Sequence, residues 1–202
     1  MVSAGVVIPV KAFAVAKGRL GDVLTPEERA SLARSLAEVV VRAAHPLPVF
    51  VVTDDAEVRD WAQSHGAAIV ADPRGGLDTA VTAGVEHVAS RGLERVIVAH
   101  GDLPLATDLA WVAEFAGITL LPDRHGDGTN VIGLPAASGF RFAYGVGSFR
   151  RHLAEARRIG LPLRIVRDPA LATDVDTPDD LATLDAMTES RNSGGSRIVG
   201  RQ

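Results

Sequence analysis

Apolar runs and amphipathic segments alternate along most of the chain. An unbroken apolar run is typical of a strand buried on both faces, whereas apolar residues repeated every three or four positions are typical of a helix. The apolar runs predict strands over 5–10, 48–54, 67–72, 95–100, 117–123, 129–134 and 162–168. The periodic segments predict helices over 25–44, 56–65, 77–91, 108–115, 148–159 and 178–187. This alternation predicts an α/β fold with a mainly parallel sheet flanked by helices.

The segment 25–44 carries the clearest helix-start signal. Thr25 is a candidate N-cap, Pro26 suits the first helical position, and Glu28 would complete a capping box. At the other end of the chain, residues 188–202 are polar and rich in glycine, a composition that buries too little apolar surface to fold. We therefore expect one domain over residues 1–187, followed by a disordered C-terminal tail over 188–202.

Composition narrows the class of protein. The chain of 202 residues contains no cysteine, which excludes a disulfide scaffold, a thiolate nucleophile and a sulfur-based zinc site. Aromatic residues make up only 4%, which argues against a stacking platform for single-stranded nucleic acid, and the net charge of −4 provides no global field for polyanions. Neither a signal-peptide pattern nor an apolar run near the roughly 20 residues of a membrane span is seen. We expect a cytoplasmic protein that acts on small molecules, without nucleic-acid or membrane partners; whether it forms a homodimer stays open.

The loop after the first predicted strand concentrates positive charge. It places Lys11, Lys17 and Arg19 beyond the carboxyl end of a strand, where open α/β sheets bind their ligands. It carries neither the GxxxxGKS or GxxxxGKT phosphate loop nor the GxGxxG fingerprint. Three cations at this place would suit a polyphosphate, because arginine binds phosphate oxygens in pairs. A solvated basic loop has the same composition, and spacing alone favours that interpretation.

Three aspartates are the sharpest candidates for metal binding. Asp102 follows a predicted strand in HGDLPL, while Asp174 and Asp176 in DVDTPDDL point to the same side of an extended chain. Neighbouring carboxylates repel each other unless a cation lies between them, and carboxylate oxygen is a preferred ligand of Mg²⁺. Each aspartate alone is equally typical of a turn, but together they favour a metal site. The acidic residues Asp179 and Asp180 instead fit the first turn of the following helix.

Glycines mark two further turns of interest. Gly75 and Gly76 precede a predicted helix and would let the backbone approach a flat ligand such as a base, although a plain tight turn has the same pattern. Gly145 and Ser148 lie at the start of the helix over 148–159, where free amides form a candidate anion site. The alternative there is ordinary capping by Ser148. The histidines show no spacing typical of metal ligands.

Taken in order, these motifs resemble those of one family. The segments VIPVKAFAVAKGRL, GGLDTAVTAG, HGDLPL, DRHGDGTNVI, YGVGSFRRHLAEA and DVDTPDDL are similar to those of the phosphoenolpyruvate / 2-phospho-L-lactate guanylyltransferase family, which acts in biosynthesis of the deazaflavin coenzyme factor 420. The resemblance runs from about Val6 to Met187 and depends on the whole set. It implies a single-domain nucleotidyltransferase fold of the sugar-nucleotide-transferase type, with GTP as co-substrate and magnesium as cofactor.

The resemblance also implies roles for particular residues. The metal ligands, which are also catalytic, would be Asp102, Asp174 and Asp176. The residues that face the triphosphate would be Lys11, Lys17 and Arg19, of which Lys17 is also catalytic. The residues near guanine would be Gly75, Gly76, Leu77 and Asp78. The residues that bind the three-carbon phosphate acceptor would be Thr129, Gly145 and Ser148.

Two positions depart from the family pattern. Gly18 stands where the family often has Ser or Thr, and Asp78 stands where it often has Asn. A carboxylate at position 78 would still accept hydrogen bonds from guanine N1 and N2, so the resemblance still implies a preference for guanine.

The reaction that the resemblance implies is guanylyl transfer. An oxygen of the acceptor's phosphate attacks the α-phosphorus of GTP and pyrophosphate leaves, which needs positioning and charge neutralisation more than a general base. The chain is rich in Ala, Arg, Gly and Val, as in products of GC-rich bacterial genomes, and bacterial members are associated with phosphoenolpyruvate. The expected product is then enolpyruvyl-diphospho-5′-guanosine. The alternatives are 2-phospho-L-lactate or 3-phosphoglycerate as acceptor and, from another class, a catalytically silent nucleotide-binding module.

Overall fold

The part of the chain that the structure describes contains one seven-stranded sheet. The computed structural model describes residues 3–184 and 186. Within them the strands are β1 (Ala4–Pro9), β2 (Val49–Thr53), β3 (Ala68–Ala71), β4 (Arg95–Ala99), β5 (Ile118–Pro122), β6 (Thr129–Pro135) and β7 (Leu163–Ile165). Their order across the sheet is β3-β2-β1-β4-β6-β5-β7. Only β6 runs antiparallel to its neighbours, so the expected mainly parallel α/β sheet is confirmed.

Helices connect most of these strands. The α-helices are α1 (Pro26–Ala43), α2 (Ala56–Ser64), α3 (Leu77–Ser90), α4 (Ser148–Ile159) and α5 (Pro169–Ala172), and short 3₁₀ turns are η1 (Phe13–Val15), η2 (Gly18–Leu20) and η3 (Ala110–Glu114). The chain is also helical over 178–184. The disordered tail expected over 188–202 lies outside the described residues, as does part of the predicted helix over 178–187.

Two short helical segments differ from the prediction. The α-helix expected over 108–115 is the 3₁₀ turn η3, because the Asp108 carboxylate accepts a hydrogen bond from the Ala110 amide at 2.7 Å and holds a local turn. The four-residue helix α5 was not predicted, since it is too short to show periodicity. Its start signal was nevertheless present, because Asp168 caps it and a proline follows.

The start of α1 follows the sequence signal. The Thr25 hydroxyl accepts from the Glu28 amide at 3.2 Å, and the Glu28 carboxylate accepts from the Thr25 amide at 2.8 Å. Pro26 occupies the first helical position, as expected. The predicted capping box is therefore confirmed, and it directs α1 away from the basic loop that precedes it.

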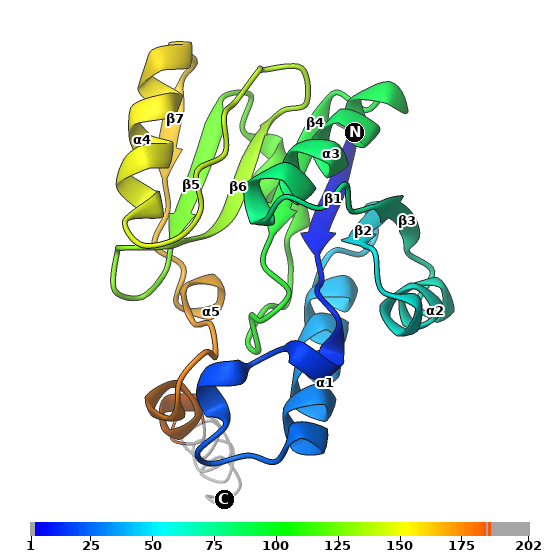
Figure 1. Cartoon of the computed structure of the whole chain (residues 1–202). Coiled ribbons are helices and arrows are strands. Elements are labelled where there is room, and N and C mark those ends of the chain that lie inside the picture. The colour runs from blue at the N-terminus through cyan, green and yellow to red at the C-terminus, as the bar shows by residue number, and fades with distance from the viewer. Residues whose placement is uncertain (1–2, 185, 187–202) are drawn as a thin grey trace, which may run out of the picture.

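Helices cover both faces of the sheet (Figure 1). Val6 and Ile8 of β1 are fully buried in a core cluster that includes residues of α1, α2 and η3. Val7, which points to the opposite face, is fully buried in a second cluster with residues of α3 and α4. This alternation explains why the strands appear as continuous apolar runs in the sequence.

The sheet topology gathers three distant segments at one edge. β1 and β4 are parallel neighbours, so their carboxyl ends, and the loops that follow them, lie together. Figure 1 shows the blue loop after β1 beside the orange segment that follows α5. Residues 3–184 and 186 include no helix that is both long and apolar enough to span a membrane.

Candidate functional site

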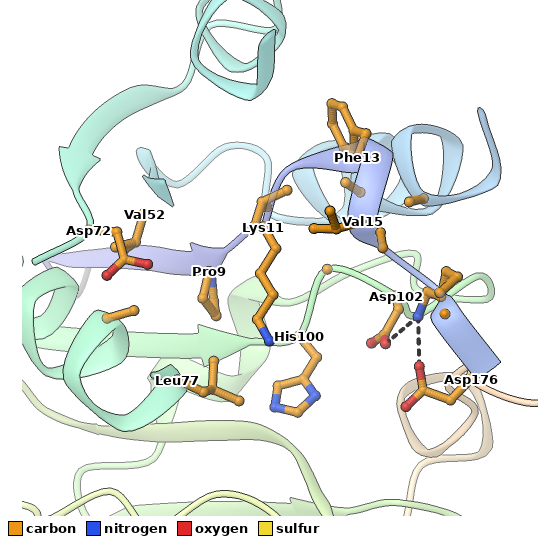
Figure 2. A pocket seen from close by; sticks show the side chains of 18 of the residues that line it. Pro9, Lys11, Phe13, Val15, Val52, Asp72, Leu77, His100, Asp102 and Asp176 are labelled. Atoms are coloured by element: carbon orange, nitrogen blue, oxygen red, sulfur yellow. Dashed lines mark hydrogen bonds and ion pairs between the residues drawn. The ribbon is translucent and has the colours of Figure 1, made fainter. Parts of the chain in front are cut away.

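A pocket of about 560 Å³ opens at the carboxyl ends of β1 and β4 (Figure 2). Its lining includes most of the residues that the sequence predicted to face the nucleotide or the metal, namely Lys11, Lys17, Arg19, Gly76, Leu77, Asp102 and Asp176. The predicted residues Gly75, Asp78, Thr129, Gly145, Ser148 and Asp174 are not among its described lining. The basic loop and the aspartates, predicted separately, therefore form one site.

Lys17 links the basic loop to the aspartates. Its ammonium Nζ lies 2.7 Å from Asp102 Oδ2 and 3.0 Å from Asp176 Oδ1, and the lysine side chain is only 8% exposed. Burial alone would lower the pKa of Lys17, but the two carboxylates outweigh it and raise the pKa above its ordinary value. The ammonium group therefore stays charged at neutral pH and holds three segments of the chain together.

The backbone at Lys17 is shaped for this contact. Lys17 adopts the left-handed conformation, with φ of 54°, between the 3₁₀ turns η1 and η2. A non-glycine residue rarely adopts this conformation without a compensating interaction. The two ion pairs supply it, because they hold the Lys17 ammonium group against Asp102 and Asp176, whose side chains Figure 2 shows at the pocket.

The carboxyl group of Asp174 lies in surroundings that disfavour its ionised form. Burial, followed by the negative charge of Asp102, raises the pKa of Asp174 above its usual range. The Asn130 amide donates a long hydrogen bond of 3.5 Å to Asp174 Oδ1, which offsets part of this effect. Asp102 Oδ1 is buried and has no hydrogen-bond partner among the described residues. The site therefore contains more carboxylate oxygen than the Lys17 ammonium neutralises.

The three aspartates do not form the compact ligand group that the sequence suggested. Among residues 3–184 and 186, no set of three or more histidine, aspartate or glutamate side chains is arranged to hold a metal ion. Two of the three carboxylates, those of Asp102 and Asp176, are instead paired with the ammonium group of Lys17. A role for Asp102, Asp174 and Asp176 in metal binding stays a prediction.

The predicted nucleotide side of the pocket is open and basic. Lys11 and Arg19 are exposed and both line the pocket. On the opposite wall Gly76, with φ of 94°, caps the start of α3, and Leu77 follows it. A side chain at position 76 would be strained by this φ, so glycine lets the backbone form a flat wall there.

Asp78 has a structural partner that the sequence did not indicate. Its Oδ1 accepts a hydrogen bond from the Tyr144 amide at 2.7 Å. Asp78 lies in the first turn of α3, whereas Tyr144 precedes α4. One oxygen of this carboxylate therefore joins the predicted guanine side of the site to the predicted acceptor side.

The expected anion site at the start of α4 is not available. The Gly147 amide donates to Asp127 Oδ2 at 2.8 Å, the Ser148 amide to the Gly145 carbonyl at 2.9 Å, and the Phe149 amide to the Asp127 carbonyl at 2.9 Å. These bonds satisfy the amides, and the Asp127 carboxylate takes the position that an anion would have. The alternative, capping by the Ser148 side chain, is not found either.

The remaining groups of the predicted acceptor region lie close together. Thr129 and Ser148 are 1% and 2% exposed, whereas Gly145 is exposed. Ser148 is the first residue of α4, and its side chain does not cap the helix. Arg151 holds the loop before α4 by donating to the carbonyls of Ala143, Tyr144 and Val146.

Two residues at the site were missed by sequence reasoning. His100 lines the pocket after β4, and its buried Nε2 has no hydrogen-bond partner among the described residues. Its ring packs against Tyr144, with centroids 5.1 Å apart. Asn130, which is bonded to Asp174, follows the predicted Thr129 directly. The only signal for either was a polar residue one or two positions from a predicted site residue, Asp102 for His100 and Thr129 for Asn130.

Acid should weaken the fold through His152, a fully buried residue of α4. Burial, then the nearby Arg151, lowers the pKa of this imidazole from 6.5 to about 4. Below about pH 6.5 the unfolded chain binds a proton at His152 that the folded chain excludes. The free energy of unfolding contributed by the neutral ring is therefore full above that pH and is lost as the pH falls toward 4. From about pH 7 to about pH 5 this loss should be about 2 kcal/mol. In urea unfolding at both pH values, His152→Gln should lose about 2 kcal/mol less stability than the wild type; equal losses would contradict this.

The fold is shared with solved transferases. A putative nucleotide-diphospho-sugar transferase from Desulfovibrio desulfuricans G20 superimposes with a TM-score of 0.75 at 18% identity, over 94% of this chain and 89% of the other. A nucleotidyl transferase from Methanothermobacter thermautotroptrophicus superimposes with a TM-score of 0.64 at 16% identity, over 93% of this chain and 99% of the other. At these identities the likeness shows the fold, which is that of nucleotidyltransferases and sugar-nucleotide transferases.

The sequence narrows this class to one family. Residues 4–193 match the family described as "Guanylyl transferase CofC like", and the chain belongs to that family. A phosphoenolpyruvate guanylyltransferase from Sphaerobacter thermophilus is 38% identical over 88% of this chain and 90% of its own length. Another, from Conexibacter woesei, is 36% identical over 96% of this chain and 92% of its own length. The expected family is confirmed, and the protein is a nucleotidyltransferase.

Proposed function

We propose that the protein transfers GMP from GTP to phosphoenolpyruvate, which releases pyrophosphate and forms enolpyruvyl-diphospho-5′-guanosine. The observation that carries this proposal is the pocket in which Lys17 bridges Asp102 and Asp176, in a chain whose curated relatives bear that activity in their names. The product would serve the biosynthesis of the deazaflavin coenzyme that the family resemblance implies.

GTP would occupy the pocket of about 560 Å³. Lys11 and Arg19 are exposed cations on its rim, and they would bind the phosphates through charge-assisted hydrogen bonds. The backbone at Gly76 and the side chain of Leu77 form the wall that the base would contact. Asp78 has one oxygen occupied by Tyr144, so its second oxygen is the one left for guanine.

The carboxylates fit magnesium by their chemistry. Asp102 Oδ1 is buried without a partner, and the pKa of Asp174 is raised by burial and by the charge of Asp102. A divalent cation would relieve both conditions, and Mg²⁺ prefers oxygen ligands from carboxylates and phosphates. Asp102, Asp174 and Asp176 would hold it. When bound, it would supply positive charge to the phosphoryl group that is transferred.

The transfer itself needs few chemical groups from the protein. A phosphate oxygen of phosphoenolpyruvate forms a bond to the α-phosphorus of GTP, and the bond between the α-phosphorus and the bridging oxygen to the β-phosphate breaks. That bridging oxygen leaves with pyrophosphate. Because the attacking oxygen is already ionised near neutral pH, no proton has to be removed from it. Lys17, Lys11 and Arg19 would neutralise charge and hold the phosphates in line.

Phosphoenolpyruvate would lie near Thr129, Gly145 and Ser148. Ser148 is buried at the start of α4, whereas Gly145, three residues before it, is exposed. His100 and Tyr144, in ring contact at 5.1 Å, connect this region to the nucleotide pocket. The acceptor would therefore approach the α-phosphate from the side opposite the basic loop.

Ser148→Ala should weaken acceptor binding selectively. The loss of one hydrogen bond to a charged ligand should raise the KM for phosphoenolpyruvate about 10- to 150-fold, with a much smaller effect on the KM for GTP. Gly145→Val should be worse, because Gly145 has φ of 96° and a β-branched residue is strained there. Steady-state kinetics with each substrate varied in turn measures both.

The matched control is Ser90→Ala, at the end of α3 and distant in sequence from the proposed acceptor residues. It should have the same KM values as the wild type. The acceptor assignment fails if Ser148→Ala changes the KM for GTP and leaves the KM for phosphoenolpyruvate unchanged.

Pyrophosphate release tests the proposed function. The purified protein, GTP or ATP, Mg²⁺ and one acceptor at a time are combined, with phosphoenolpyruvate, 2-phospho-L-lactate or 3-phosphoglycerate as acceptor. We expect release that requires both GTP and phosphoenolpyruvate. Release with 2-phospho-L-lactate or 3-phosphoglycerate alone would reassign the acceptor. Binding of GTP without any release would identify a nucleotide-binding module instead.

A further inference from the structure

His152 is a buried titratable residue for which the transfer chemistry has no use. It lies on α4 one turn after Ser148 and is fully buried. Its Nε2 lies 3.0 Å from the Ala143 amide nitrogen, and its Nδ1 lies 3.0 Å from Thr129 Oγ1. The rings of Phe140, Phe142 and Tyr144 surround it, with centroids 5.7, 6.4 and 4.7 Å away.

These contacts determine the form of the ring. A backbone amide can only donate, so Nε2 accepts from Ala143 and carries no hydrogen. The single hydrogen of the neutral imidazole is therefore on Nδ1, which donates to the Thr129 hydroxyl. The pKa of His152, lowered to about 4, agrees with a neutral ring near pH 7.

The ring thus connects three segments that carry the proposed acceptor residues. Thr129 begins β6, Ala143 lies two residues before Gly145, and Ser148 occupies the same face of α4 as His152. Outside this ring, Arg151 donates to the carbonyls of Ala143, Tyr144 and Val146, all of which lie in the loop before α4. None of these residues lines the nucleotide pocket.

We infer that His152 is the positioning residue of the acceptor site, which holds β6, the loop before α4 and the start of α4 at a fixed separation through its two ring nitrogens. This inference rests on the proposed function, because it assigns those segments to phosphoenolpyruvate. It places His152 behind the site, without contact to either substrate. Its loss should therefore affect acceptor binding and spare GTP.

Two conservative variants separate the two hydrogen bonds of the His152 ring. His152→Gln places an amide near the position of Nε2 and keeps an acceptor for Ala143, but it loses the donor to Thr129. His152→Asn places an amide near the position of Nδ1 and keeps that donor, but it loses the bond to Ala143. Each should raise the KM for phosphoenolpyruvate about 3- to 10-fold, the effect of one neutral hydrogen bond, and should leave the KM for GTP within about 2-fold.

Thr129→Val leaves the His152 ring in place but removes the hydroxyl that accepts from Nδ1, so it breaks the same hydrogen bond from the other side. It should raise the KM for phosphoenolpyruvate at least as much as His152→Gln, because Thr129 also lies at the proposed acceptor site. The double variant should be no worse than Thr129→Val, because the bond between the two side chains is already lost. Kinetics are measured well below the thermal midpoint of each variant. Equal increases in the KM for both substrates, an unchanged KM for phosphoenolpyruvate, or additive effects in the double variant would overturn the inference.

A separate readout keeps this test distinct from the proposed function. The ¹⁵N shifts of the His152 ring, measured near neutral pH without substrates, should show a protonated Nδ1 and an unprotonated Nε2. A hydrogen on Nε2 would overturn the inference even in an active enzyme. If the wild type transfers nothing to phosphoenolpyruvate, the proposed function fails, and with it the assignment of His152 to an acceptor site; the ring shifts then report only whether the bridge exists.

Discussion

Asp174→Asn is expected to reduce turnover at least about 100-fold and yet leave the protein as stable as the wild type or more stable. The pKa of Asp174 is raised by burial and by the charge of Asp102, so the ionised carboxylate destabilises the fold at neutral pH. Replacing it with the neutral amide removes this cost. The same change removes one of the oxygens proposed to hold magnesium.

Asp102→Asn should lose turnover to a similar extent but should also lower the thermal midpoint. The reason is its 2.7 Å ion pair with buried Lys17, which Asp174 lacks. Asp179→Asn, an exposed acid on the following helix, is the matched control and should keep its turnover within about 2-fold. Near wild-type rates at saturating magnesium in Asp102→Asn and Asp174→Asn would contradict the assignment of these carboxylates.

Lys17→Met should also reduce turnover about 100-fold or more, because it removes a positive charge from the proposed site of phosphoryl transfer. It should destabilise the protein as well, since Asp102 and Asp176 would be left without their cation. The solvated basic loop that spacing alone favoured would have an exposed lysine here, and the loss of an exposed cation barely affects stability. The structure changes this expectation, because the Lys17 side chain is only 8% exposed.

Arg19→Met provides the matched comparison in the same loop. Arg19 is exposed, so its replacement should raise the KM for GTP without changing the thermal midpoint. Thermal melts and GTP kinetics on both variants measure the contrast. A Lys17→Met protein that keeps its rate, or an Arg19→Met protein that unfolds earlier with normal GTP kinetics, would show that the loop is structural.

Local signals in the sequence were sufficient for most of the fold. The strands appear as apolar runs because both faces of the sheet are covered, and the start of α1 follows from Thr25, Pro26 and Glu28 alone. An apolar run alone does not show that β6 is antiparallel to its neighbours. The direction of β6 depends on the short hairpin after β5, where the Asp123 carboxylate accepts from the Asp127 and Gly128 amides.

The candidate site was predictable as a set of residues but not as a set of contacts. Lys17 and Asp102 are 85 residues apart, and their pairing depends on parallel β1 and β4 ending at one edge. The free amides expected at the start of α4 are satisfied by Asp127, 20 residues before Gly147. Such long-range hydrogen bonds leave no periodic pattern in a single sequence.

The contacts of His152 and His100 could not be predicted from the sequence either. Each is a lone histidine without metal-like spacing, so the sequence favours an ordinary structural role for both. Only the fold shows that one ring bridges Thr129 to Ala143 and that the other lines the pocket.

The mass of the product tests the central claim most directly. The protein is incubated with GTP, Mg²⁺ and an equimolar mixture of phosphoenolpyruvate and 2-phospho-L-lactate, and the nucleotide products are identified by mass spectrometry. Enolpyruvyl-diphospho-5′-guanosine should be the main product. It should form at least about 100-fold more slowly with Asp174→Asn and at a near wild-type rate with Asp179→Asn. A predominance of the lactyl adduct would contradict the choice of acceptor, and the absence of any guanylylated product would contradict the activity itself.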